Sequence, residues 1–182
     1  MRILAISGSL RLLSSNTALL RTAELLAPPN VEISFYEGLS SLPLFNPDSE
    51  NREFPSVSDF RAQIRASNGI LIASPEYAHG IPGAMKNALD WIVGSGELVD
   101  KPVALLNASS RATHAYESLK EVIKMMNAHI IAEASVIIPL PHNEIDQASI
   151  IAHVELSGLL RKALVSFAYA IETQLHKSLS RN

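Results

Sequence analysis

Short apolar runs alternate with longer amphipathic segments along the chain. The runs Ile3–Ile6, Gly69–Ser74 and Val103–Ala108 are almost continuously apolar. Runs of this length and composition are typical of strands buried on both faces of a parallel sheet. Val31–Tyr36 instead alternates apolar and polar residues, which predicts a half-exposed strand at the sheet edge. A fifth strand is predicted over Ile130–Ile138.

The segments between these strands carry apolar residues at helical spacing. Leu39–Pro55 differs, because it holds three prolines and two asparagines and therefore predicts a long surface loop. Pro82 is suited to the first turn of a helix. Helices are expected over residues 16–27 and 57–66, from Pro82 to about Gly94, around Tyr116–Met126, and over 149–177.

Strands and helices thus alternate from one end of the chain to the other. Alternation of this kind predicts an α/β fold with a parallel sheet and helices on both faces, because parallel strands need right-handed crossovers. Such sheets bind ligands at the carboxyl ends of their strands, where the strand order reverses. The loops that begin at Ser7, Ser74 and Ala108 are therefore the candidates for a binding site.

Length, charge and cysteine content narrow the classes of function. A chain of 182 residues predicts one domain over residues 1–182, with 47% hydrophobic residues for its core. A net charge of −3 excludes binding to nucleic acid or anionic lipid through a strongly basic surface. No cysteine is present, which excludes disulfides, thiolate–metal sites and a cysteine nucleophile. No apolar stretch approaches the ~18 residues of a membrane helix, so we expect a cytoplasmic protein.

The loop after the first strand combines hydrogen-bond donors with the start of a helix. Ser9, Ser14, Ser15 and Asn16 carry donor side chains, and Arg11 can hold two phosphate oxygens in a bidentate fork. A helix N-terminus adds backbone N–H groups and a positive dipole end. The composition suits a terminal phosphate group. The alternative is a capped turn in which Ser14 or Ser15 serves only as the N-cap and Arg11 is solvated.

Several familiar site patterns do not occur in the sequence. It contains neither Gly-x-Gly-x-x-Gly nor the Gly-x4-Gly-Lys-Ser/Thr P-loop, which disfavours the usual dinucleotide fingerprint and nucleoside triphosphate hydrolysis. It also lacks the Gly-x-Ser-x-Gly elbow of many serine hydrolases. The six histidines form no i,i+4 pair and no cluster with carboxylates at ligand spacing, so no metal site is expected.

The loop after the third strand has an unusual composition. Residues 74–83 include two prolines and two glycines, which fix the backbone path and can direct N–H groups toward a planar ligand. Tyr77 supplies an aromatic face beside that path. The first loop has the form Gly-Ser-Leu-Arg-x-x-Ser-x-Asn, and the second has the form Pro-Glu-Tyr-x-x-x-x-Pro-Gly-x-x-Lys-Asn-x-x-Asp-Trp.

Together, these two motifs resemble the NADPH-dependent FMN reductase family, which includes quinone and chromate reductases. The resemblance in order and spacing extends over nearly the whole chain. It implies a flavodoxin-like three-layer sandwich with a five-stranded parallel sheet in the order 2-1-3-4-5. It also implies FMN as cofactor, NADPH or NADH as hydride donor, a small-molecule electron acceptor and a homodimer or homotetramer.

Carried over by position, the resemblance assigns FMN binding to residues of both loops: Ser9, Leu10, Arg11, Ser14, Ser15, Asn16, Pro75, Glu76, Tyr77 and Ala78. Two positions depart from the family pattern. Ala78 stands where the family often has asparagine, and the third loop, Asn107–Ala115, has no glycine where relatives usually have several. The candidates for contact with the second substrate are His79, Ser110, Arg111 and His114; for each histidine the alternative is a loop side chain facing water.

No side chain is expected to act as a catalytic acid or base, because flavin N5 accepts the hydride. A flavodoxin-type electron carrier is the main alternative to the enzyme, and a non-catalytic phosphate-binding module is a third. Carriers tend to be strongly acidic, so the charge of −3 favours the enzyme. Trp91 lies on the flank of a helical apolar stripe and either packs against another subunit or belongs to the core; Asp90 is expected on the helix surface or at an interface.

Overall fold

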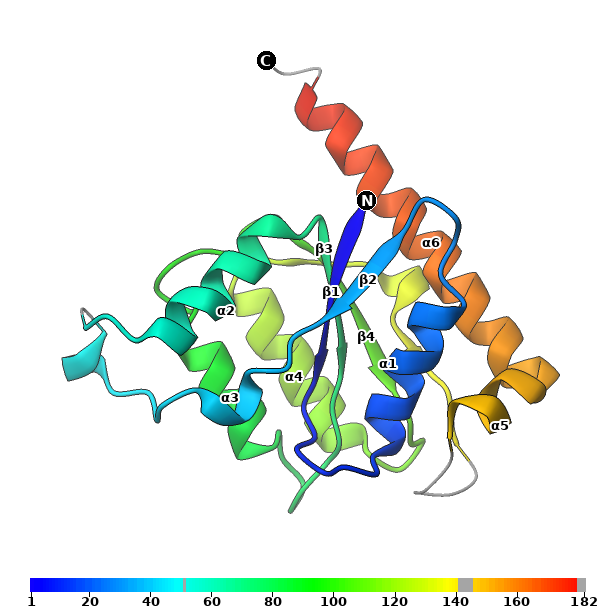
Figure 1. Cartoon of the computed structure of the whole chain (residues 1–182), viewed down its shortest axis with the longest axis horizontal. Helices are drawn as coiled ribbons and strands as arrows, with labels where there is room; N and C mark the ends of the chain where they lie inside the picture. The colour runs from blue at the N-terminus through cyan, green and yellow to red at the C-terminus, as the bar shows by residue number, and fades with distance from the viewer. Residues whose placement is uncertain (51, 141–145, 180–182) are drawn as a thin grey trace.

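The computed structural model describes residues 1–50, 52–140 and 146–179, and a parallel sheet runs through its centre (Figure 1). The main strands are β1 (Arg2–Ser7), β2 (Glu32–Phe35), β3 (Gly69–Ala73) and β4 (Pro102–Asn107). Their order is β2-β1-β3-β4-β5, and every pairing is parallel. The predicted flavodoxin-like order 2-1-3-4-5 is confirmed, with β2 at the edge that its alternating pattern indicates.

Helices cover both faces of this sheet and give the predicted three layers (Figure 1). One face carries α1 (Ser15–Leu25), α5 (Gln147–Ala152) and α6 (Val154–Leu179). The other carries α2 (Pro55–Ala66), α3 (Gly83–Asp90) and α4 (Thr113–Met125).

Two apolar clusters hold the layers together, one on each side of the sheet. Successive residues of a strand point to opposite faces, so each buried strand contributes to both clusters. In β1, for example, Ile3 packs with the α1 and α6 side, and Leu4 packs with the α2 and α4 side. The core strands β3 and β4 are buried along their whole length. This double burial is the physical reason for the continuous apolar runs in the sequence.

The predicted fifth strand over 130–138 is wrong in its continuity. It consists of two short pieces, β5 (His129–Ile130) and β6 (Val136–Ile137), which pair with opposite ends of β4. Between them lies a 3-10 turn, Ala132–Ala134, which packs against α6. The hydroxyl of Ser135 takes the place of ladder bonds there, because it accepts from the N–H of Leu105 at 3.1 Å and donates to the carbonyl of Ile131 at 2.8 Å.

The predicted single helix over 149–177 is also wrong, since it is two helices separated at His153, whose backbone is extended (φ −83°, ψ 102°). The break lets α5 pack against α1 as well as α6. Ile150 is thereby fully buried. Apolar spacing continues through the break, so spacing alone does not reveal it.

The long loop at 39–55 contains two 3-10 turns and is held in place by α3 and the residue that follows it. Asn87 accepts the N–H of Phe45 at 2.8 Å and donates to the carbonyl of Pro43 at 3.0 Å. Trp91 donates its indole N–H to the same carbonyl at 2.7 Å and is 1% exposed. Of the two alternatives for Trp91, core packing within the chain is correct, so this residue does not support a subunit contact. Asp90 lies at the helix surface, paired with Lys86 at 2.5 Å.

Candidate functional site

A cleft of about 280 Å³ lies at the carboxyl ends of β1, β3 and β4, where the three candidate loops meet. Most of the residues singled out from the two sequence motifs line it. From both predicted loops these are Ser9, Arg11, Ser14, Ser15, Asn16, Pro75, Glu76 and Tyr77. Leu10 and Ala78 are not part of the lining. Of the four candidates for the second substrate, Arg111 lines the cleft, and His79, Ser110 and His114 lie outside its lining.

The first loop is shaped by its own serine hydroxyls. Ser7 bonds Thr17 through their hydroxyls at 2.8 Å, and the Ser9 hydroxyl accepts the N–H of Arg11 at 3.3 Å. Ser14 is the N-cap of α1, since its hydroxyl accepts the N–H of Thr17 at 3.4 Å. Because Ser9 and Ser14 act as acceptors here, each keeps its O–H proton for a ligand oxygen.

Gly8 is required where the first two loops approach one another. Its N–H donates to the carbonyl of Ala73 at 2.8 Å, which continues the pairing of β1 with β3 into the loops. A Cβ at this position would lie 2.2 Å from the hydroxyl oxygen of Ser74 and 2.8 Å from its Cβ. The contact fixes the spacing between the two loops that form the cleft.

The second loop contains a tight turn in a strained conformation. Tyr77 and Gly80 exchange two backbone hydrogen bonds of 3.1 and 3.0 Å. Between them, Ala78 and His79 have positive φ angles of 49° and 58°. Both central residues of a type I′ turn need positive φ, which asparagine and glycine tolerate best. With alanine and histidine the turn costs about 1–2 kcal/mol per residue, which other contacts of this loop must offset.

The third loop holds its shape without glycine. None of residues 107–115, all within the described part of the chain, has a positive φ. The side chain of Asn107 instead spans the loop, donating to the carbonyl of Ala112 at 2.9 Å and accepting the N–H of Ser109 at 3.0 Å. The Ser109 hydroxyl then accepts the N–H of Arg111 at 3.2 Å. Side-chain bonds therefore replace the conformational freedom that glycines would supply.

Three lining residues were not selected from the sequence: Asn107, Ser109 and Ala112. Asn107 is 2% exposed and ends an otherwise apolar buried strand. A polar residue at the carboxyl end of such a strand is the signal by which it could have been found. Ser109 and Ala112 carry no comparable signal.

The donor set at the cleft fits an FMN phosphate. The first turn of α1 has no acidic residue, and the first loop offers hydroxyls, the Arg11 guanidinium and helix N-terminal N–H groups. Asn16 is 6% exposed, and its side-chain oxygen has no hydrogen-bond partner among the described residues. A buried polar atom of this kind is uncommon in a finished structure. Because an amide oxygen only accepts hydrogen bonds, the ligand group that satisfies it is a donor such as a hydroxyl, and not a phosphate oxygen.

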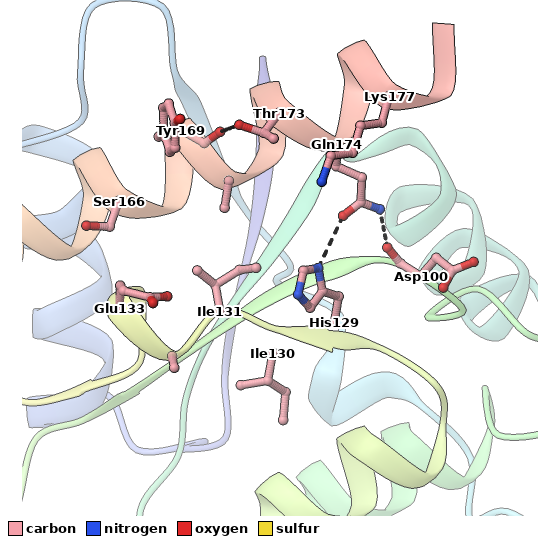
Figure 2. A pocket seen from close by; sticks show the side chains of 12 residues that line it. Asp100, His129, Ile130, Ile131, Glu133, Ser166, Tyr169, Thr173, Gln174 and Lys177 are labelled. Atoms are coloured by element: carbon pink, nitrogen blue, oxygen red, sulfur yellow. Dashed lines mark hydrogen bonds between the residues drawn. The ribbon is translucent and has the colours of Figure 1, made fainter. Parts of the chain in front are cut away.

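A larger groove of about 870 Å³ lies elsewhere, between α6 and the β5 edge (Figure 2). Asp100 and His129 line it, and they precede or begin strands β4 and β5, so it lies toward the amino ends of the strands. Six residues of β4 separate it from the cleft by about 20 Å. Its polar side chains are tied together, since Gln174 bonds both His129 and the carbonyl of Asp100. None of the residues selected from the sequence lines this groove.

Comparison with known proteins identifies the family to which the chain belongs. The family model described as NADPH-dependent FMN reductase matches residues 1–143. The chain belongs to this family. As an NADPH-dependent FMN reductase family member it is an oxidoreductase that uses FMN with NAD(P)H as the electron donor, and its acceptors are small molecules. The enzyme is therefore favoured over the electron-carrier alternative.

Two relatives and one solved structure illustrate the similarity. An NAD(P)H-dependent FMN reductase of Pseudomonas aeruginosa is 36% identical over 151 residues, which cover 80% of this chain and 81% of the relative. A probable NADPH:quinone oxidoreductase of Oryza sativa is 33% identical over 186 residues, covering 96% and 91%. The flavoenzyme NAD(P)H:(acceptor) oxidoreductase of Paracoccus denitrificans matches with a TM-score of 0.77 and 25% identity, covering 94% and 97%.

Two kinds of feature are absent from the described residues. No helix among them combines the length and apolar character needed to cross a membrane. In the same residues, no three or more His, Asp or Glu side chains are grouped so that they could hold a metal ion. His142, one of the six histidines considered in the sequence, lies outside the described residues.

Proposed function

We propose that this family member transfers electrons from NADPH, by way of FMN, to a quinone or a free flavin. The relatives named above, an FMN reductase and a quinone oxidoreductase, support these two acceptor classes. When bound, FMN supplies the redox chemistry, because its ring accepts and passes on a hydride or electrons. The protein has to hold the ring, neutralise the phosphate and leave one side of the site open to a second substrate.

One observation carries the assignment of the site. A loop that offers hydroxyl and guanidinium donors and a helix N-terminus faces, across a single cleft, a loop with an exposed aromatic side chain, Tyr77. We assign the phosphate to Ser9, Arg11, Ser14, Ser15 and Asn16, where charge-assisted hydrogen bonds are strongest.

The flavin ring is assigned to the second loop, through Pro75, Glu76 and Tyr77, with Leu10 and Ala78 as neighbours that contribute backbone. Arg111 lies on the third-loop side of the same cleft and is our first candidate for contact with the second substrate. His79, Ser110 and His114 are further candidates at the rim. None of these side chains is assigned an acid–base role.

The remaining parts of the proposal concern the state of the protein. It folds as one domain over residues 1–182, forms a homodimer or homotetramer and acts in the cytoplasm. The family resemblance supports the oligomer. Light scattering at working concentration tests this point, since a fully active particle of 19.7 kDa would contradict it.

The phosphate assignment is tested by replacing Arg11. Arg11→Ala removes a charge-assisted hydrogen bond worth about 1.5–3 kcal/mol. FMN affinity should therefore fall roughly tenfold to 150-fold. Riboflavin has the same ring without the phosphate, so its weaker affinity should hardly change. Fluorescence titration of both ligands measures the effect, and Arg52→Ala, at an exposed arginine away from the cleft, is the matched control.

Three outcomes are distinguished by this pair of ligands. Loss for FMN alone supports the phosphate assignment. Equal losses for FMN and riboflavin show that Arg11 shapes the loop, and unchanged affinities for both show that Arg11 is only solvated; either result contradicts the phosphate assignment. If the wild-type chain takes up no FMN at tens of micromolar, the proposed function itself fails. Anaerobic bleaching of bound FMN by NADPH then tests the reaction directly.

A further inference from the structure

The carboxylate of Glu76 joins two of the loops that form the cleft. Its Oε2 accepts the backbone N–H of Ala115, in the first turn of α4, at 2.9 Å. Its Oε1 lies 3.3 Å from Nδ1 of His79, within its own loop. The Glu76 side chain is 13% exposed, so its carboxylate is largely shielded from water, whereas the His79 side chain is 78% exposed. Glu76 thus connects the second loop to the end of the third.

Helix α4 lacks a cap of its own, and Glu76 supplies one. Its N-cap residue, Ala112, makes no side-chain capping bond, and its first turn contains no acidic residue. The first N–H groups of a helix need partners from outside the helix, and a carboxylate also complements the dipole there. A carboxylate from a different loop meets both needs, and this makes the start of α4 dependent on the second loop.

Two histidines extend the same connection. The rings of His79 and His114 meet edge to face with centroids 4.7 Å apart. His114 belongs to the first turn of α4, and His79 has the positive φ of the strained turn. Glu76 and His114 therefore both contact His79, whose positive φ an isolated turn disfavours.

These contacts determine how the two sides of the cleft face one another. Tyr77, on one side, directly follows Glu76. Arg111 and Ala112, on the other, come shortly before Ala115, the residue that Glu76 binds. The third loop is braced at its other end by Asn107. With Glu76 in place, the loop is fixed at both ends.

We propose that Glu76 is a positioning residue that holds the third loop against the second and so sets the spacing of Tyr77 and Arg111 across the cleft. This inference rests on the proposed function, since it concerns the same cleft. Glu76 acts through the reach of its side chain to the Ala115 N–H. Its negative charge complements the dipole of α4, but the charge is not what sets the spacing of the cleft.

Three substitutions separate reach from charge. Glu76→Gln keeps an oxygen at the same reach and loses the charge, whereas Glu76→Asp keeps the charge and is one methylene too short. Glu76→Ala loses both. We expect the Glu76→Asp and Glu76→Ala variants to bind FMN about tenfold more weakly than the wild type, which is near the lower end of couplings typical between linked sites. Gln should stay within about twofold of wild type. Glu117→Ala, at an exposed glutamate of α4 outside the cleft, is the control.

A second measurement needs no cofactor. Hydrogen exchange of the Ala115 amide in the apoprotein should accelerate in the Asp and Ala variants and stay slow with Gln, because only Gln retains its acceptor. If FMN uptake fails already in the wild type, the exchange result still decides whether the bridge exists, so failure of the proposed function is recognised separately. Thermal melting of each apoprotein shows whether it is folded.

The combined results leave no neutral outcome. Slow exchange and near-normal FMN affinity with Gln, together with fast exchange and weak binding with Asp, support positioning by reach. If the Asp variant showed wild-type exchange and FMN affinity while the Gln variant matched the Ala variant, charge would be the requirement and the proposal would be overturned. Fast Ala115 exchange in the Ala variant without any change in FMN affinity would also overturn it, as would unchanged exchange in all three. If the Glu76→Ala variant does not fold, the comparison of the Gln and Asp variants tests the proposal by itself.

Discussion

Gly8 provides a direct test of the close approach between the two flavin loops. In Gly8→Ala, the new methyl carbon would lie 2.2 Å from Ser74 Oγ and 2.8 Å from Ser74 Cβ. Real Cβ atoms do not approach so closely, so the loops must separate. Overpacking of a tight contact typically costs about 1–3 kcal/mol. We expect a loss of this size in the free energy of unfolding, together with weaker FMN binding.

The Ser74→Gly background removes both clashing atoms and isolates this cause. The nearest remaining atom is Ser74 Cα at 3.1 Å, which requires a shift of only a few tenths of an ångström. Gly8→Ala should therefore cost much less there, with a coupling of about 1–2 kcal/mol between the two sites. Urea unfolding of the wild type, the two single variants and the double variant measures this coupling. FMN titration of the same four proteins measures the effect on binding in the cleft.

Gly158→Ala is the matched control because a Cβ at Gly158, within α6, would meet nothing within 4 Å. Gly158→Ala should stabilise the protein by roughly 0.5–1 kcal/mol, since glycine is unfavourable inside a helix. If Gly8→Ala were as well tolerated as Gly158→Ala, or if Ser74→Gly failed to relieve it, the close approach of the loops would be refuted.

Two further predictions concern buried polar groups on the α2 side of the sheet. Burial and nearby Asp59 raise the pKa of Tyr36 from 10.0 to about 12, so the folded state retains a proton that the unfolded state loses. Between pH 10 and 12 the protein should therefore lose about 2–3 kcal/mol of stability, and Tyr36→Phe should remove this part of the loss in pH-dependent urea unfolding. Glu97, whose side chain is 2% exposed, accepts from Arg65 at 2.8 Å and from the Ser95 hydroxyl. Glu97→Gln should lower the free energy of unfolding by about 2 kcal/mol in the same assay, and an unchanged midpoint would contradict that role.

Burial on both faces made the fold predictable from the sequence. Strands such as Gly69–Ala73 have apolar residues at every position because helices cover both sides, and few other arrangements of strands produce this pattern. The break at His153 and the interruption after Ile130 left no such trace. They depend on where α5 packs and on one hydroxyl, that of Ser135, which replaces ladder bonds with a distant strand.

Two loops of the site were predictable from the local composition of the sequence. Donors concentrated beside a helix start identified the loop around Arg11, and the proline–glycine path identified the loop around Tyr77. Asn107 was not selected, although its bonds to Ser109 and Ala112 are local and its polar side chain ends an otherwise apolar strand. The Glu76–Ala115 contact was not predicted, because it joins residues 39 positions apart in the chain. The position of Trp91 shows the same limit, since its partner, Pro43, precedes it by 48 residues.

The interruption between β5 and β6 also affects how the protein behaves in a crowded solution. A long exposed edge strand offers a row of unpaired amides and carbonyls on which the strand of another molecule can add, leading toward aggregation. Here that side of the sheet presents two strands of two residues each, separated by a 3-10 turn. An incoming strand would find no continuous ladder to extend. The Ser135 hydroxyl thus lets the sheet end without becoming a template for others.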